Sequence, residues 1–408
     1  MTVLKETNIF RSDDLAIDFF SFGNAPNKSI AITFTPFATH GAVSLDGIGY
    51  GGELLLRNGF DVIAFKSAKN LWYQNLSSET LFAVEQFIAT LQTSYVKRVG
   101  YGSSMGGYAA IQFAKNLRLN IVLALSPQFE IDKSYDQRWQ SAASLIEFQH
   151  RIDASAIAAD CRYFVAYDPG TVDVRHIEKL RELIDAQALV EIPTPFSGHP
   201  VGVYLAEIGL IQNFSLSILK YGSVKAVSMG RQRRYSKTYL FELSKQLASR
   251  KKNKSALIAI DKAIMIDSEA PEFHIHRSIL LDELGQPDAA LLAAYEARRK
   301  PIIDPYLMGA LSDRLAKHGD FVAARSLIEK AISIDASMLH FHVLECTLCK
   351  ALGDISGAIA AGEYALRLSP DDAKLMIRVS KLHVTHGGLA HWARSAVLAK
   401  NAIFSRSG

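Results

Sequence analysis

The chain has 408 residues, of which 49% are hydrophobic and 21% charged, with a formal net charge of +4. This composition is typical of a folded globular protein, and so mild a charge gives no reason to expect a nucleic-acid partner. The length predicts two domains, and the three cysteines are too few for a disulfide framework. We find no signal-peptide pattern and no apolar run of about 18 residues, so we expect a cytoplasmic protein without a transmembrane segment.

The first part of the chain, residues 1–215, alternates short apolar runs with amphipathic stretches. Apolar runs of this kind are typical of strands covered on both faces of a parallel sheet. The sequence predicts strands at 15–22, 30–35, 60–65, 98–103, 120–125, 162–167 and 189–192, and helices at 79–92, 108–117, 174–186 and 201–210. This alternation indicates a three-layer α/β domain with a mainly parallel sheet.

The predicted strand 98–103 runs into a Gly-x-Ser-x-Gly pentapeptide at residues 102–106, and a helical pattern follows. A strand, a glycine-flanked serine and a helix in this order form a nucleophile elbow, in which the serine backbone is strained. Both glycines are needed because a side chain there would collide with the neighbouring strand or helix. This frame selects Ser104 over the adjacent Ser103 as the nucleophile.

A serine hydroxyl needs an adjacent base, and a histidine base needs a carboxylate that fixes its tautomer. Asp168 and His199 each follow a predicted strand, at the sheet edge where parallel sheets place their active groups. With these motifs, residues 1–215 resemble the α/β-hydrolase superfamily, in which nucleophile, acid and base follow in this order along the chain. The resemblance implies the roles of nucleophile for Ser104, acid for Asp168 and base for His199.

Other residues compete for the acid and base positions. Asp173 is a second candidate acid, although a cap of the helix that begins at Val174 is the favoured interpretation. Glu130 and Asp132 follow the preceding strand and offer a further alternative. We expect surface or capping roles for His176 and His150, and a place lining the pocket, but not the role of base, for His40.

An oxyanion hole requires backbone N–H donors near the developing charge. The N–H of Met105, directly after the nucleophile, is the first expected donor. The second is expected from the loop after strand 30–35, which lacks the His-Gly-Gly pattern of many esterases. Pro36 has no N–H, so Phe37 is the better candidate and Ala38 the next.

Three residues at strand ends are candidates for substrate binding. Trp72 and Tyr73 form either a substrate platform or a loop that packs on the helix below, and Gln128 is placed to line the pocket. Only residues 128–161 are available for a lid, so we expect an open site that admits large acylated substrates.

The second part of the chain repeats every 34 residues, as its turn glycines show: Gly285, Gly319, Gly353 and Gly387. Alanines recur with the same spacing at 263, 297, 331, 365 and 399, where small residues let two helices approach closely. A helix–turn–helix unit of this length resembles the tetratricopeptide repeat (TPR) family. The repeats span 237–270, 271–304, 305–338, 339–372 and, in part, 373–405. The resemblance implies an all-α solenoid that binds a protein partner or mediates self-association.

Between the two parts, residues 216–236 form a predicted basic linker, and the basic stretch as a whole spans 225–254. It is interpreted as a solvated linker with the polar outer face of a capping repeat, or as a contact to an anionic polymer or membrane surface. The pair Cys346-x-x-Cys349 has redox or metal spacing, but both residues fall on positions expected in the repeat core. We therefore expect no metal and no cofactor.

Together these features predict a serine hydrolase that acts on an acyl ester, fused to a TPR interaction domain. Three alternatives stay open: an acyltransferase, a serine peptidase with the same triad, and a catalytically silent scaffold.

Overall fold

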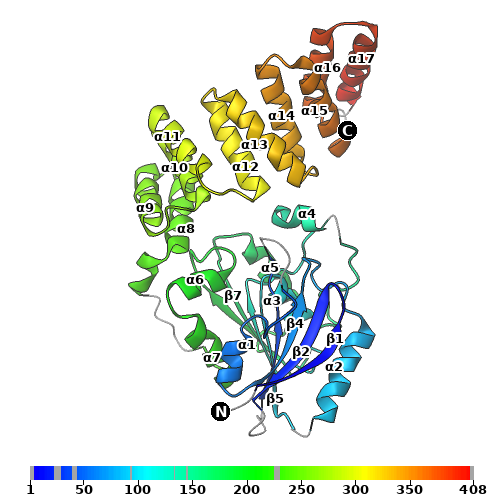
Figure 1. The fold of residues 1–408 in the computed structure, drawn as a ribbon, viewed down its shortest axis with the longest axis vertical. Helices are drawn as coiled ribbons and strands as arrows, with labels where there is room; N and C mark the ends of the chain where they lie inside the picture. The colour runs from blue at the N-terminus through cyan, green and yellow to red at the C-terminus, as the bar shows by residue number, and fades with distance from the viewer. Residues whose placement is uncertain are drawn as a thin grey trace. The chain divides into compact units, whose positions relative to one another are not determined.

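The computed structural model describes residues 4–22, 29–38, 44–91, 94–132, 134–143, 146–224 and 230–404. They form two compact units, Met1–Gln246 and Leu247–Gly408. The first is an α/β unit and the second is entirely helical (Figure 1).

The first unit is built on one sheet in the strand order β1-β2-β4-β3-β5-β6-β7-β8. The strands are β1 (Lys5–Arg11), β2 (Leu15–Ser21), β3 (Ser29–Phe34), β4 (Asp61–Ser67), β5 (Lys97–Ser103), β6 (Ile121–Leu125), β7 (Arg162–Tyr167) and β8 (Leu189–Pro193). All seven strands expected from apolar runs are present. The sequence missed β1, because its side chains are mostly exposed and polar.

The sheet is mixed, which corrects the prediction of a mainly parallel sheet. β2 pairs antiparallel with both β1 and β4, whereas the ladders from β4 through β3, β5, β6 and β7 to β8 are parallel. The physical reason is the short turn after β1, closed by a hydrogen bond from Ser12 N to Leu15 O. So short a connection allows only antiparallel pairing, since parallel strands need a crossover.

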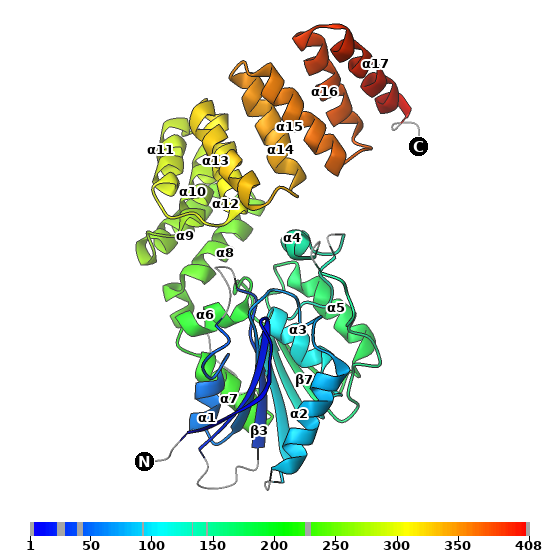
Figure 2. The same cartoon turned by 45° about the vertical axis from the view of Figure 1, so that its right-hand side comes forward.

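Helices lie on both faces of the sheet (Figure 2). They are α1 (Gly52–Arg57), α2 (Ser78–Thr90), α3 (Met105–Gln112), α4 (Gln140–Ala143), α5 (Asp173–Leu183), α6 (Val201–Glu207) and α7 (Ile211–Tyr221), with 3-10 turns η1 (Gln137–Trp139) and η2 (Gln232–Tyr235). Alternate residues of the strands, such as Ile30, Ile32 and Phe34, form one buried core with α2, α3 and α5. This packing fixes the carboxyl ends of the parallel strands at one edge.

The first unit extends beyond the boundary expected from the sequence. The predicted linker 216–236 contains the end of α7, whose Ile218 and Leu219 are buried. In addition, the division between the units falls inside α8 (Lys237–Ser249), between Gln246 and Leu247. Residues 237–246 therefore belong with the α/β unit, although the repeat pattern assigns them to the first repeat.

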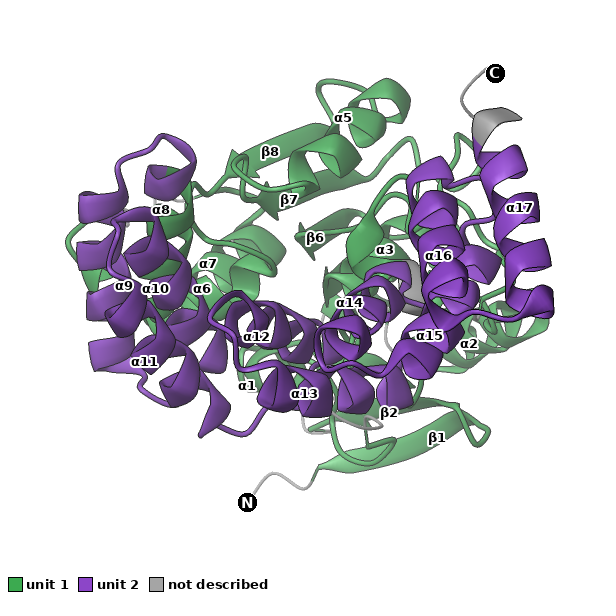
Figure 3. Cartoon of the chain, turned by 90° about the horizontal axis from the view of Figure 1, so that it is seen from above, with its two compact units in different colours: residues 1–246 green, residues 247–408 purple. Residues whose placement is uncertain are grey.

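The second unit continues as a series of paired helices, shown in purple in Figure 3. They are α9 (Asn253–Ile266), α10 (Pro271–Glu283), α11 (Pro287–Arg298), α12 (Pro305–Lys317), α13 (Phe321–Ile334), α14 (Leu339–Ala351), α15 (Ile355–Leu368), α16 (Ala373–His386) and α17 (Leu389–Phe404). Gly285, Gly319 and Gly353 turn the chain between helices at φ 73°, 85° and 82°, where glycine is favoured. This confirms the helical repeat solenoid predicted from the 34-residue period.

Within the described residues, no single helix is both long and apolar enough to cross a membrane. In the same part of the chain, one pair of helices, α6 and α7, meets the length and composition criteria when taken together, and the chain bends by 117° between them.

Candidate active site

Ser104 lies in a sharp turn between β5 and α3. Its backbone has φ 53° and ψ −118°, a combination that non-glycine residues rarely adopt. A Cβ atom on Gly102 would overlap the carbonyl group of Gly106, and one on Gly106 would overlap the carbonyl of Phe34. The requirement for both glycines is thus confirmed. Because α3 begins at Met105, the backbone N–H groups of its first turn have no partner within the helix.

His199 meets Ser104 from the loop after β8. Its Nε2 atom lies 3.0 Å from Ser104 Oγ. The loop is held from behind by Asp168, whose two carboxylate oxygens accept the N–H groups of Gly170 and Gly198, each at 2.8 Å. Ser104 and His199 are therefore brought together as predicted, and Asp168 shapes the loop that carries the histidine.

The carboxylate that contacts His199 is Asp173, which corrects the choice of Asp168. The two Asp173 oxygens lie 2.9 and 3.1 Å from His199 Nδ1. The cap interpretation of Asp173 is also wrong, since Val172 occupies the N-cap position and Asp173 is the first helical residue. From the sequence, an aspartate at a helix start looks like a cap. Only the fold shows that this turn of α5 faces the β8 loop.

The protonation pattern follows from the environment of Asp173. Burial alone would raise the pKa of this carboxyl, but its contacts with His199 and Arg138 outweigh burial and hold the pKa below its usual range. An ionised Asp173 accepts a hydrogen bond from His199 Nδ1–H. The lone pair of Nε2 is then left to accept the hydroxyl proton of Ser104.

A second set of charges supports Asp173 from the other side. Arg138 Nη2 donates to Asp173 at 2.8 Å, and the same guanidinium binds both oxygens of Asp136. His176 Nε2 lies 3.0 Å from Asp136, and its Nδ1 accepts the N–H of Phe129. His176 is fully buried, so the expectation of a surface or capping role for it is wrong.

The other candidates have different partners. Glu130 pairs with Arg151 and Asp132 accepts bonds from Ser134, so neither reaches His199. His150 bonds the carbonyl oxygen of Leu76 at 2.7 Å. His40 lies outside the described residues.

Aromatic rings cover the histidine. The Trp139 ring lies 5.5 Å from the His199 ring, and Phe37 packs between Trp139 and Trp72 at 5.1 and 5.5 Å. Ser104 is only 3% exposed, so it is less accessible than the expected open site implies. The turn η1, which carries Trp139, is held in place by the ion pairs of Arg138 with Asp136 and Asp173.

The predicted substrate residues divide into two groups. Tyr73 is fully buried and its hydroxyl lies 2.9 Å from Thr35 Oγ1, so it fits the packing interpretation. Trp72 is also fully buried and belongs to the aromatic cluster. Gln128 reaches the site directly, with Nε2 2.9 Å from Ser104 Oγ and 3.2 Å from His199 Nε2.

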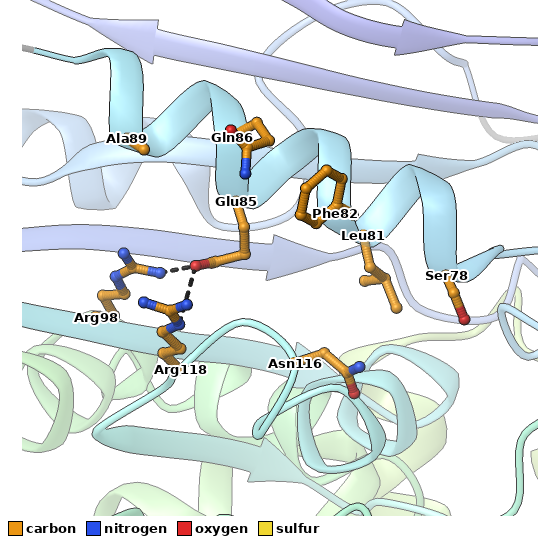
Figure 4. A pocket seen from close by; sticks show the side chains of 9 residues that line it. All are labelled: Ser78, Leu81, Phe82, Glu85, Gln86, Ala89, Arg98, Asn116 and Arg118. Atoms are coloured by element: carbon orange, nitrogen blue, oxygen red, sulfur yellow. Dashed lines mark hydrogen bonds and ion pairs between the residues drawn. The ribbon is translucent and has the colours of Figure 1, made fainter.

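A separate hollow lies between α2 and the amino-terminal end of β5, the end opposite Ser104 (Figure 4). Its lining residues are Ser78, Leu81, Phe82, Glu85, Gln86, Ala89, Arg98, Asn116 and Arg118. Both arginines are paired with Glu85, whose single negative charge balances one of their two positive charges. This hollow shows no chemistry comparable to the site at Ser104.

The cysteine pair of the repeats is packed as expected. Cys346 and Cys349 are each 1% exposed, and burial raises the pKa of the Cys349 thiol to about 11. Among the residues that the structure describes, no group of three histidine, cysteine or acidic side chains is arranged to hold a metal ion.

No family model and no curated protein matches the chain. Solved structures resemble its helical part. MamA from Desulfovibrio magneticus RS-1 is 14% identical, covering 44% of this chain and 97% of its own, with a TM-score of 0.38. YrrB, a TPR protein with an unusual peptide-binding site, is 14% identical over 42% of this chain and 87% of its own, with a TM-score of 0.37. PilF from Pseudomonas aeruginosa is 12% identical over 41% of this chain and 76% of its own, with a TM-score of 0.36.

Proposed function

We propose that this chain is a serine hydrolase of the α/β-hydrolase type that cleaves an acyl ester, and that its helical repeats bind a protein partner or a large acylated substrate. The observation that carries the proposal is the hydrogen-bonded series Ser104–His199–Asp173, with the serine at positive φ at the end of a parallel strand. A strained serine, a base and a buried carboxylate in contact are the groups that acyl transfer through a serine requires.

In the proposed reaction, Ser104 Oγ attacks the acyl carbon while its proton passes to His199 Nε2. Asp173 stabilises the imidazolium that forms, and the N–H of Met105 donates to the oxyanion. Phe37 N–H is the proposed second donor, because Pro36 beside it has none. His199 then gives the proton to the leaving alcohol oxygen, which departs and leaves Ser104 acylated. A water molecule deprotonated by His199 attacks the ester, and Ser104 recovers its proton as the acid leaves.

The test is covalent labelling of the full chain with a small fluorophosphonate. We expect one label per chain, located by peptide mass at Ser104 and absent in Ser104→Ala. Ser103→Ala is the matched control, because this neighbouring buried serine makes no contact with His199 among the described residues, and it should label at the normal rate. A folded wild-type protein that takes no label would refute the proposed function.

Acyl transfer to another alcohol is a second candidate, favoured by the burial of Ser104 and by the rings over His199. A covered acyl-enzyme is protected from water until an acceptor arrives. Adding a panel of alcohols to the ester assay separates the two: a hydrolase releases free acid throughout, whereas a transferase yields the new ester.

A further inference from the structure

Gln128 is a fully buried amide at the reacting atoms. It follows β6 and places Nε2 within 2.9 Å of Ser104 Oγ and 3.2 Å of His199 Nε2, with no exposed surface. Ser126, two residues earlier, ties this loop to the sheet by a 2.7 Å bond from its N–H to Ala166 O. Gln128 is therefore held in place and not free to turn toward solvent.

The orientation of the amide follows from the hydrogen bonds around it. Because His199 Nδ1–H donates to Asp173, His199 Nε2 carries a lone pair. The amide oxygen of Gln128 would be repelled by that lone pair, whereas its NH2 group is attracted both to it and to Ser104 Oγ. The NH2 group therefore faces the serine and the histidine, and Oε1 is turned to the other side.

In that orientation Oε1 is a buried acceptor to which no described residue donates. Buried acceptors are nearly always satisfied in native proteins, so a missing partner calls for an explanation. The Nε1–H groups of Trp72 and Trp139, both in the ring cluster over His199, are buried donors without an acceptor among the described residues. Unmet groups of both kinds therefore occur in Gln128 and in the ring cluster that packs on His199.

We propose that Gln128 Oε1 accepts a hydrogen bond from the acyl group of the substrate. The substrate then carries an O–H or N–H donor on the carbon next to its scissile carbonyl. This inference rests on the proposed hydrolase function. The amide oxygen and nitrogen are about 2.2 Å apart, so Oε1 lies within about 5 Å of Ser104 Oγ. Once the carbonyl carbon is bonded to Oγ, a donor on that neighbouring carbon lies about 3 to 4 Å from Oγ, close enough to donate to an acceptor that is itself about 5 Å from Oγ. The substrate class is thus a 2-hydroxyacyl or 2-aminoacyl ester.

The test compares esters that differ only in this donor: ethyl 2-hydroxypropanoate, ethyl 2-methoxypropanoate and ethyl propanoate, each rate divided by that of hydroxide-catalysed hydrolysis. We expect kcat/KM of the wild type to favour the hydroxy ester by about 10- to 100-fold, the range expected when a single buried acceptor is left without its donor. In Gln128→Met, which keeps the length of the side chain without the amide, this ratio should fall to near one. The ratio is the readout, because loss of the contact to Ser104 lowers all the rates together.

Gln112→Met is the matched control, since Gln112 is a buried glutamine on α3 whose Oε1 also lacks a partner, about two turns from Ser104. It should keep the wild-type ratio. A wild-type ratio near one would overturn the inference and leave a buried water as the partner of Oε1. A ratio that survives in Gln128→Met would also overturn it. If Gln128→Met does not fold, the wild-type ratio still decides. Failure of fluorophosphonate labelling in the wild type would instead reject the hydrolase function itself.

Discussion

Arg138 donates to Asp173 at 2.8 Å, on the same carboxylate that holds His199. The two arginine partners, Asp136 and Asp173, are each about 1% exposed in their side chains. The next residue along the chain, Trp139, covers the His199 ring. The short turn η1 thus supplies both the arginine that orients Asp173 and the tryptophan ring that packs on His199.

We predict that Arg138→Gln lowers the rate of ester hydrolysis by about 10- to 100-fold, because Asp173 loses an orienting donor of the kind that supports active-site groups. The measurement is kcat on an activated ester. Arg181→Gln is the control: Arg181 pairs with Glu191 on the surface of α5 and should leave kcat unchanged. Equal rates in the two variants would contradict a positioning role for Arg138.

The identity of the acid is decided by two asparagine variants. Asp173→Asn should lower kcat by about ten-thousandfold, because an amide cannot hold the histidine tautomer or stabilise its charged form. Asp168→Asn keeps one acceptor for the backbone N–H groups of Gly170 and Gly198 and should lose about tenfold. A larger loss in Asp168→Asn would restore Asp168 as the acid.

The contrast between these two aspartates shows where sequence reasoning reaches its limit. Ser104 was predictable because the glycine frame places it at the end of β5, and His199 was predictable because it is the histidine in the loop after the last parallel strand. The choice between Asp168 and Asp173 depends on how the chain between β7 and α5 turns, and both residues follow the same strand. Likewise, Trp139 could not be placed over His199, because its position depends on ion pairs between residues far apart in the sequence.

Trp139→Ala tests whether the ring that packs on His199 restricts access to Ser104. Removing the ring exposes Ser104, so a bulky fluorophosphonate should label about tenfold faster than it labels the wild type, while a small one changes less. Trp392→Ala is the control, since this tryptophan of α17 is 58% exposed and lies in the other unit. If the bulky and the small probe respond alike, Trp139 does not restrict access.

Asp136 makes the stability of the first unit dependent on pH. Burial would raise the pKa of this carboxyl, but hydrogen bonds from His176 and Arg138 outweigh burial and hold it well below its usual range. A lowered pKa stabilises the fold above the unfolded value of about 4, and this contribution is lost as the pH falls toward the folded value. Asp136→Asn should cost about 2 kcal/mol at pH 6, a value reduced for the partial exposure of Arg138.

The measurement is the free energy of unfolding in urea between pH 6 and pH 2. The difference between wild type and Asp136→Asn should shrink steadily below about pH 4, because the carboxyl of the unfolded chain takes up a proton there while Asp136 of the folded protein stays ionised. Glu182→Gln is the control, as its pairing with Lys179 is exposed. A difference that stays constant down to pH 2 would mean that the Asp136 carboxylate does not contribute through its charge.

The division inside α8 predicts where the first unit can be cut. Tyr239 packs its ring on Phe196, in the loop that carries His199, and on Tyr204 of α6, at 5.6 and 6.4 Å. Thr238 donates to Glu207 at 2.7 Å.

A chain ending at residue 246 should therefore keep the unfolding temperature of the first unit and its labelling at Ser104. A chain ending at 236 lacks these contacts, so we expect it to unfold several degrees lower and to label more slowly, because the His199 loop loses its support. Two truncated chains that melt and label alike would place the boundary at 237, where the 34-residue period alone puts it.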